Sequence, residues 1–391
     1  MTRHPSARPT MRVLAVAFAA FVMIGVATSV LGVAWPSIRD HFSRSVADLG
    51  ILIASGSIGF ITASSLYGRL HVRAGTGRLL IGGSVGVLVG LAGIAVAPSW
   101  GWIVATSLVL GFGSGLVDTG LNAHAALAFD LRSMNLLHGC FGLGSTLGPV
   151  VMTVSLTATG AWRAGYWALA IAQVGAVAAI WLRRGDWSEG EADLSANAMA
   201  ARRRRLRLTL MLALFFVYTG VEVGAGQWAF TLLTEGRGMG TAAAGAWVAA
   251  YWGGLTVGRF VFGFSGERIG RGRLLAGSMA VVLIGLGILW LDPAGLGAIG
   301  LPITGLGLAA IFPALVSLTP TRIGRDRSTT TVGYQLAAAT LGVAVVPWLL
   351  GVVAESRGLE ALAPGLFLVA VIMTVVYLVG EIEARAHHRA V

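Results

Sequence analysis

The chain has 391 residues, of which 56% are hydrophobic and 12% are charged, and its mean hydropathy is +0.80. A soluble domain carries about 25% charged residues, whereas the apolar residues here form runs of roughly 20, the length that crosses a bilayer as a helix. This composition excludes a soluble enzyme, a nucleic-acid-binding protein and a secreted disulfide scaffold. It predicts an all-α membrane protein, whose net charge of +11 comes from arginines between the apolar runs.

Twelve apolar runs predict twelve transmembrane helices. They cover residues 13–35, 46–68, 79–97, 101–126, 134–157, 163–182, 208–232, 241–263, 274–291, 295–318, 329–353 and 360–380. The first run follows three arginines and is longer than the apolar part of a signal peptide, so we expect it to be retained as a helix. A charged segment after the sixth run predicts a cytoplasmic central loop, 183–207, between two six-helix bundles, 1–182 and 208–391.

The arginines predict the orientation of these helices. Of the 28 arginines, 23 lie on the side of the membrane that also holds both termini, and five lie on the other side. Because basic residues are enriched in cytoplasmic loops, we expect both termini in the cytoplasm and the protein in the inner or plasma membrane.

The two halves of the chain repeat a loop rich in glycine and arginine. The loops after the second and eighth runs contain Gly68, Arg73 and Arg78, and Gly263, Glu267, Arg268 and Arg273. Three glycines and two arginines of the two loops coincide at an offset of 195 residues, and later runs share Gly-x-Gly and Gly-x4-Pro patterns. Two parallel six-helix repeats predict a substrate site between the halves, near the midplane of the membrane, and alternating access to it.

These loops resemble the signature loop of the major facilitator superfamily, a Gly-x-x-x-Asp-Arg-x-Gly-Arg pattern after spans 2 and 8. The resemblance implies the twelve-helix major facilitator fold, and it implies that the loops control the conformational change of transport. The second loop keeps an acid at Glu267, whereas Val72 occupies the acid's position in the first loop. The first half therefore lacks the acid that anchors a charge network in the family.

Spans 4 and 5 carry a second set of motif residues, namely Asp118, Thr119, Asn122, Arg132, Asn135, Leu136, His138, Phe141 and Gly142. They are similar to the acid-Thr-x-x-Asn and Arg-x-Asn-Leu-x-Gln patterns, followed by Phe-Gly, of the fucose-permease-like branch of proton-coupled sugar symporters. Segments around Glu222, Tyr251 and Phe312-Pro313 look like the glucose-transporting side of that branch. Its fucose carriers have Asn and Asp residues in span 1, where this chain has Gly32, so we do not expect a fucose-type pocket.

Two acids lie well inside the predicted spans, Asp118 in span 4 and Glu222 in span 7. A carboxylate at membrane depth costs about 2.5–3.5 kcal/mol on insertion scales, so each acid is a candidate functional group. Burial disfavours the charged form of a carboxylate, and a carboxylate whose exposure alternates can load and release a proton. We therefore expect proton coupling at both residues. The alternatives are a structural hydrogen bond at Asp118 and a buried contact with a Tyr or Arg at Glu222.

Polar residues of spans 4 and 5 are candidates for substrate binding. Asn122 lies one helical turn from Asp118, and Asn135 and His138 share a polar face of span 5. Because His138 occupies the place of the branch's Gln near the cytoplasmic end of the span, we expect it to form a hydrogen bond with the substrate or a gate. A proton relay is the alternative.

The candidates in the second half are amides, which pair with sugar hydroxyls, and aromatic rings, which stack on a sugar's apolar face. They are Gln227, Trp228, Tyr251, Trp252 and Gln335. The alternative for the aromatic residues is anchoring at the membrane surface, where Trp and Tyr gather. Gly224 and Gly226 predict a loosened helix beside Glu222, as in the binding helices of other transporters.

These features predict a secondary transporter that carries a small neutral solute, a hexose or related sugar, inward with protons. A proton-driven exporter of the same fold is the alternative, because Gly144-x-x-x-Gly148-Pro149 resembles an antiporter signature. An enzyme is not expected, because the sequence shows no nucleophile–base pair, metal-ligand cluster or phosphate loop. We expect a monomer in the lipid bilayer without a cofactor, metal or nucleic-acid partner, and sodium stays open as the coupling ion.

Overall fold

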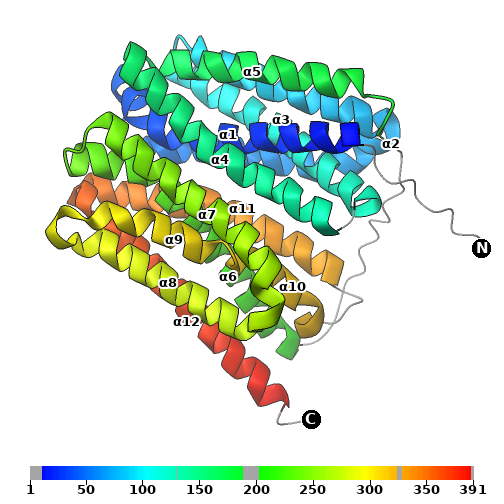
Figure 1. The fold of residues 1–391 in the computed structure, drawn as a ribbon, viewed down its shortest axis with the longest axis vertical. Helices are drawn as coiled ribbons and strands as arrows, with labels where there is room; N and C mark the ends of the chain where they lie inside the picture. Colours follow the sequence, from blue (N-terminus) through cyan, green and yellow to red (C-terminus); the bar gives the residue numbers. More distant parts are fainter. Residues whose placement is uncertain (1–10, 130, 188–201, 324–327, 389–391) are drawn as a thin grey trace, which may run out of the picture. The chain divides into compact units, whose positions relative to one another are not determined.

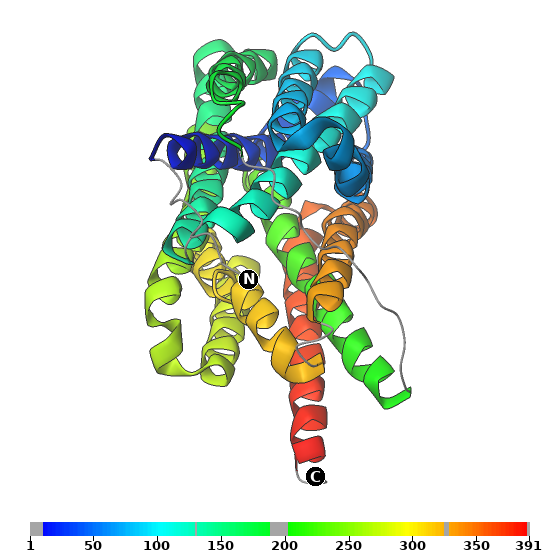
Figure 2. The same cartoon turned by 90° about the vertical axis from the view of Figure 1, so that its right-hand side faces the viewer.

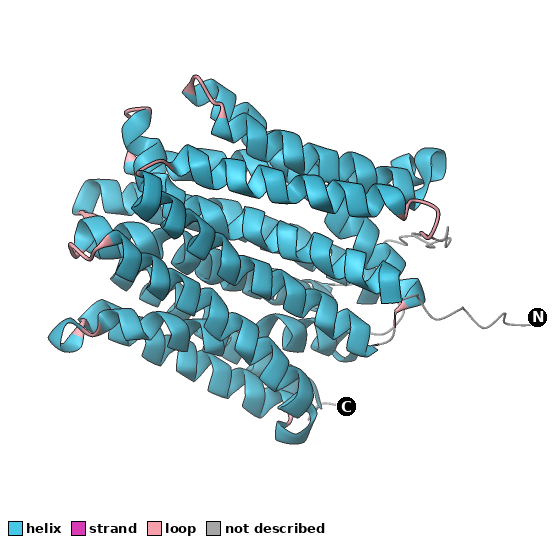
Figure 3. Ribbon diagram, turned by 45° about the horizontal axis from the view of Figure 1, so that its top comes forward, coloured by secondary structure: helices cyan, strands magenta, loops and turns pink. Residues whose placement is uncertain are grey.

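The computed structural model describes residues 11–129, 131–187, 202–323 and 328–388. These residues form helices joined by short loops (Figure 3). Contacts group the chain into two units. Unit 1 contains the chain up to Ile38 and Ser55–Leu194, and unit 2 contains Arg39–Ala54 and the chain from Ser195 onward.

The helices follow the order of the predicted spans (Figure 1). The first half of the chain forms α1 (Met11–His41), η1 (Val46–Asp48), α2 (Leu49–Ala95), α3 (Trp100–Ala128), α4 (Leu131–Thr159) and α5 (Trp162–Leu182). The second half forms α6 (Arg202–Thr231), η2 (Leu232–Gly236), α7 (Thr241–Ile269), α8 (Arg271–Leu291), η3 (Pro293–Gly295), η4 (Gly297–Ile299), α9 (Gly300–Leu308), α10 (Ile311–Ile323), α11 (Ser328–Arg357), η6 (Leu359–Ala361) and α12 (Leu362–His388). In unit 2, α6 packs against α11 and α12 (Figure 2), and α9 packs against α7 and α8.

The helices are long and apolar enough for a membrane protein. Ten helical segments of the described residues could each cross a bilayer, and one of them, Val46–Ala95, is 50 residues long. Together they overlap eleven of the twelve predicted spans, which extend past the ends of these segments by at most two residues, and the remaining span lies in α7, which has 29 residues. The all-α prediction is therefore confirmed, and the arrangement is consistent with twelve spans.

Two predicted boundaries take a different form in the structure. The tenth predicted span divides into α9 and α10 with a turn at Ala309 and Ala310, because Pro313 has no N–H to donate to the carbonyl four residues earlier. The predicted loop after span 2 is helical except at Gly75, whose φ of 75° and ψ of 161° kink α2. Gly270, 195 residues later, separates α7 from α8 with a φ of 83°. Both conformations favour glycine, so the repeat extends to the backbone.

Close helix crossings also recur in the two units. In unit 1, Gly111 of α3 lies so close to Gly56 of α2 that a Cβ would overlap the Gly56 carbonyl oxygen. In unit 2, Gly305 of α9 meets the Tyr251 carbonyl of α7 in the same way. The members of the second pair follow those of the first by 194 and 195 residues, so the repeat predicted from the loops is also a repeat of helix packing.

The α1–α4 crossing depends on the glycines of the antiporter-like motif. A Cβ on Gly144 of α4 would overlap the carbonyl oxygen of Val22 in α1, and a Cβ on Gly148 would overlap the Ser29 hydroxyl. In unit 2, a Cβ on Gly342 of α11 would likewise overlap the carbonyl oxygen of Phe216 in α6. Close packing therefore explains these glycines, as small residues let membrane helices approach each other.

The segment Arg39–Ala54 leaves the rest of the first half and packs within unit 2. Its Arg39 forms an ion pair with Glu235 of η2, with 2.9 Å between Nη1 and Oε2. Trp348 of α11 covers Gly50 at the start of α2. The predicted division of the chain into two bundles did not include this exchange.

We expect Gly144→Ala to lower the free energy of unfolding by about 1–3 kcal/mol, the usual cost of overpacking a close-packed interior, because the added Cβ would overlap the Val22 carbonyl. Gly82→Ala is the matched control, since a Cβ at this exposed position of α2 meets nothing within 4 Å. Thermal unfolding of both variants in detergent measures the difference. Equal stability of the two variants would contradict the close α1–α4 crossing.

Candidate substrate and coupling site

Asp118 lies in α3 with a half-buried side chain. Asn122, one turn later, donates from Nδ2 to the main-chain oxygen of Asp118 at 3.0 Å, and Thr119 donates to the Ser64 hydroxyl of α2 at 3.0 Å. Among the described residues, no cation forms an ion pair with Asp118. The prediction that Asp118 and Asn122 lie on one helical face is confirmed by this contact. The Asp118 carboxylate, without a cationic partner in the described part of the chain, can exchange a proton.

The two span 5 candidates differ in what the structure describes. The side chain of Asn135 lies outside the described residues, although its backbone belongs to α4. His138 is exposed, and its ring meets the Phe21 ring of α1 edge-on, with 5.7 Å between the centroids. His138 therefore lies at the α1–α4 crossing.

Glu222 connects α6 to α7. It is 8% exposed, and Arg259 of α7 donates from Nη2 to Glu222 Oε1 at 3.3 Å. Tyr251, also in α7, donates its hydroxyl to the main-chain oxygen of Glu222 at 2.6 Å. The buried Glu–Arg contact that the sequence offered as an alternative is thus present, and the coupling role of Glu222 stays a prediction.

The three aromatic candidates lie in the core of unit 2. Trp228, Tyr251 and Trp252 are at most 1% exposed, so membrane-surface anchoring is wrong for them. Trp228 Nε1 donates to the carbonyl oxygen of Pro347 in α11 at 2.9 Å. The Trp252 ring stands edge-on to the Tyr251 ring, with 5.1 Å between the centroids. These contacts fix the rings in the interior.

The predicted loosening of the helix beside Glu222 is wrong. Residues Arg202–Thr231 form one α-helix that includes Gly224 and Gly226. A Cβ on Gly226 would overlap the Trp252 ring. This glycine therefore makes room for an aromatic side chain and leaves the helix intact.

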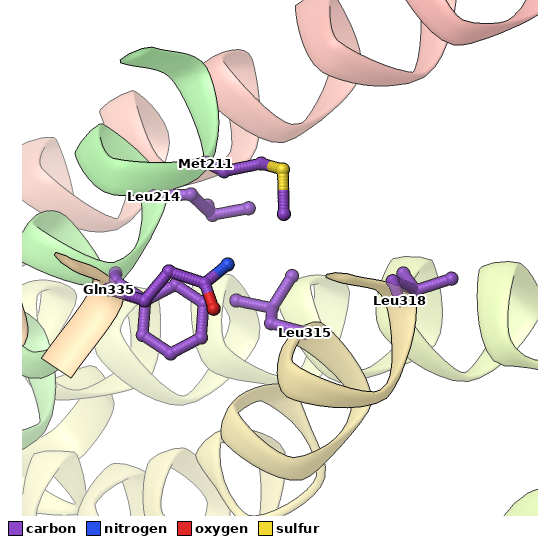
Figure 4. Close-up of a pocket in the computed structure, with 6 residues that line it drawn as sticks. Met211, Leu214, Leu315, Leu318 and Gln335 are labelled. Atoms are coloured by element: carbon purple, nitrogen blue, oxygen red, sulfur yellow. The ribbon is translucent and has the colours of Figure 1, made fainter. Parts of the chain in front are cut away.

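The two amide candidates of unit 2 are buried. Gln227 is 3% exposed and Gln335 of α11 is fully buried. Thr319 donates to Gln335 Oε1 at 3.1 Å, whereas Gln335 Nε2 has no partner among the described residues. Figure 4 shows the amide at a hollow lined by Met211, Leu214, Phe215, Leu315 and Leu318. Gln335 thus offers an amide NH2 group, with two N–H donors, in apolar surroundings.

The signature-loop residues lie at the two glycine breaks. Gly68, Arg73 and Arg78 flank the Gly75 kink, and Arg273 is exposed in α8. Gly263 and the side chains of Glu267 and Arg268 belong to the part whose burial the structure does not describe. In the first loop, His71 Nε2 and Thr76 Oγ1 form a hydrogen bond of 3.0 Å, and the His71 ring stacks on Tyr67. A hydrogen bond therefore spans the kink where the family's acid is missing.

Arg259 is the site residue that sequence reasoning missed. It lies near the predicted cytoplasmic end of span 8, and its side chain reaches Glu222. Tyr218, buried in α6, also interacts with Glu222. A search for basic as well as acidic residues inside the apolar runs would have found Arg259.

The sequence matches the family description "Major Facilitator Superfamily" over residues 17–347. The chain belongs to the major facilitator superfamily. The superfamily resemblance of the loops is therefore confirmed, and the superfamily consists of transporters rather than enzymes.

Three proteins of the superfamily illustrate the similarity. The sodium-dependent glucose transporter 1A of Mus musculus is 27% identical over 140 residues, which are 34% of this chain and 32% of that protein, so this match spans about a third of the mouse relative. The glucose/galactose transporter of Brucella abortus is 25% identical over 87% of each chain. The crystal structure of a D-xylose-proton symporter has a TM-score of 0.75 at 15% identity, covering 93% of this chain and 97% of that chain, and shows the same fold.

We expect Tyr251→Phe to lower the free energy of unfolding of this transporter by about 1 kcal/mol, the net value of an ordinary hydrogen bond, because it removes a buried hydroxyl that donates to Glu222. Tyr334→Phe is the control, since Tyr334 is 55% exposed. Thermal unfolding in detergent measures both. Unchanged stability of Tyr251→Phe together with a raised KM would assign the hydroxyl to the substrate instead.

Proposed function

We propose that this protein carries a hexose or related sugar into the cell together with protons, by alternating access between its two halves. The relatives support the substrate class, because the glucose/galactose transporter of Brucella abortus aligns over 87% of each chain. The amide of Gln335 supports it as well, since sugars need hydrogen-bonding groups and Gln335 Nε2 has no partner among the described residues.

The half-buried carboxylate of Asp118 carries the proposal of proton coupling. It lies in the membrane, and it has no ion-pair partner among the residues that the structure describes. A carboxylate in that position is costly when charged, so it binds a proton where water reaches it from one side and releases the proton on the other. Asp118 is the principal protonation site in this proposal, and Glu222 assists coupling.

The substrate contacts of the proposal come from both halves. They are Asn122, Asn135, His138, Gln227, Trp228, Tyr251, Trp252 and Gln335. Gln335 is the most specific of them, because its buried Nε2 has no partner among the described residues. The two signature loops control the exchange between the transport states.

The proposal also covers the oligomeric state of the protein, its membrane and its orientation. It works as a monomer in the cell membrane, with both termini in the cytoplasm and without a cofactor. The placement of the arginines supports this orientation. The export alternative rests on a motif whose Gly144 and Gly148 also pack in the α1–α4 crossing.

We expect Asp118→Asn to abolish proton-driven accumulation of hexose in proteoliposomes, down to the level of protein-free liposomes, because the amide keeps the size of the side chain but cannot titrate. Radiolabelled uptake of a hexose panel with and without an inward proton gradient measures this. Asp186→Asn is the control, since Asp186 is exposed after the end of α5. Hexose accumulation driven by a sodium gradient would show that sodium, and not the proton, is the coupling ion. Proton-driven movement of lipophilic cations without hexose uptake would establish the exporter.

A further inference from the structure

Two isolated charges face each other inside unit 2. Glu222 and Arg259 are the only acidic or basic residues in the predicted spans 208–232 and 241–263, and the next three predicted spans contain none. Their side chains are 11% and 19% exposed, and 3.3 Å separates Arg259 Nη2 from Glu222 Oε1. The pair therefore contributes opposite charges to an otherwise uncharged membrane region.

The surroundings hold this pair beside groups suited to a sugar. Tyr251 fixes the main chain of Glu222 through its hydroxyl, and Tyr218 interacts with Glu222 from the same helix. The Trp252 ring lies against the next turns of α6 at Gly226. The two charges thus lie among uncharged tyrosine and tryptophan side chains, which give no preference for either sign of charge.

The low dielectric of this region makes the balance of charge decisive. Charges interact more strongly there than in water, and an Arg guanidinium without a carboxylate partner binds the carboxylate of a ligand in bidentate geometry. A carboxylate without an Arg partner attracts an ammonium group in the same way. An acidic or basic solute must therefore compete with one member of the pair and is repelled by the other, whereas a neutral solute leaves the pair intact.

We propose that the Glu222–Arg259 pair sets the charge selectivity of the transporter, so that Arg259 is a specificity-determining residue and the pair restricts transport to uncharged sugars. This inference rests on the proposed function. It assigns a role to a residue outside the substrate contacts named above. It also names a class of excluded solutes, the sugar acids and amino sugars.

Binding of glucose, glucuronate and glucosamine to the purified full-length protein tests the inference. We expect wild type to prefer glucose. In Glu222→Gln we expect the affinity ratio of glucuronate to glucose to rise at least about tenfold, because one uncompensated buried charge changes affinity by this factor or more. In Arg259→Gln we expect a similar rise in the affinity ratio of glucosamine to glucose. The double variant Glu222→Gln/Arg259→Gln is neutral again and returns to the wild-type ratios.

Matched variants separate charge from folding. Arg259→Lys keeps the charge and is expected to keep the preference for glucose, and Arg357→Gln removes an exposed charge at the end of α11 without changing the ratios. Size-exclusion chromatography and thermal unfolding identify variants that do not fold. If both single variants fail to fold, the charge swap Glu222→Arg/Arg259→Glu and the neutral double variant are tested instead. The swapped pair is still neutral overall, so a swap variant that prefers glucuronate or glucosamine to glucose overturns the inference.

The outcomes distinguish this inference from the proposed function. If wild type binds glucose and a folded Glu222→Gln shows an unchanged ratio of glucuronate to glucose, the charge-selectivity inference is overturned and sugar transport stands. If neither wild type nor any folded variant binds a sugar of any charge, both the proposed function and the inference are overturned.

Discussion

Both units depend on places where glycine lets two helix backbones touch. Membrane helices gain no hydrophobic free energy from contact with one another, because lipid is as apolar as the helices, so close packing must supply the attraction. Gly111 provides such a contact in unit 1, and its repeat partner Gly305 meets the main chain of Tyr251 in unit 2. Since the Tyr251 hydroxyl bonds to Glu222, the same crossing positions the charged pair of the candidate site.

The two halves share this packing but differ in their electrostatics. Asp118 is partly exposed and has no ion-pair partner in the described part of the chain, whereas Glu222 is paired with Arg259. Removing one member of a buried pair leaves an uncompensated charge and is strongly destabilising. A carboxylate with an arginine partner therefore takes up a proton less readily than one without an ion-pair partner. This asymmetry fits the proposal that Asp118 is the principal protonation site and that Glu222 assists coupling.

Much of the fold was predictable because its determinants are local in the sequence. An apolar run of sufficient length specifies a membrane helix by itself, and the contact between Asn122 and Asp118 follows from the turn of a single helix. Hydropathy does not predict the break at Ala309 and Ala310, because the apolar run continues through it, and Pro313 is the local signal for the break.

The partner residues in contacts between helices could not be identified from the sequence. Glu222 and Arg259 are 37 residues apart, and Thr319 and Gln335 are 16 apart. Whether such residues meet depends on the axial register and rotation of two helices, which one sequence does not determine. The membrane-surface alternative for Trp252 was wrong for the same reason, since the space left by Gly226 became visible only once α6 and α7 were placed together.

Because Arg39–Ala54 packs within unit 2, cutting the backbone between the two halves would separate residues that are in contact. A break in the backbone between the sixth and seventh predicted spans would leave this segment on one fragment and its packing partners, Glu235 and Trp348, on the other. Neither fragment alone would then satisfy all of its own contacts. The native contacts of unit 2 therefore require residues from both halves of the chain.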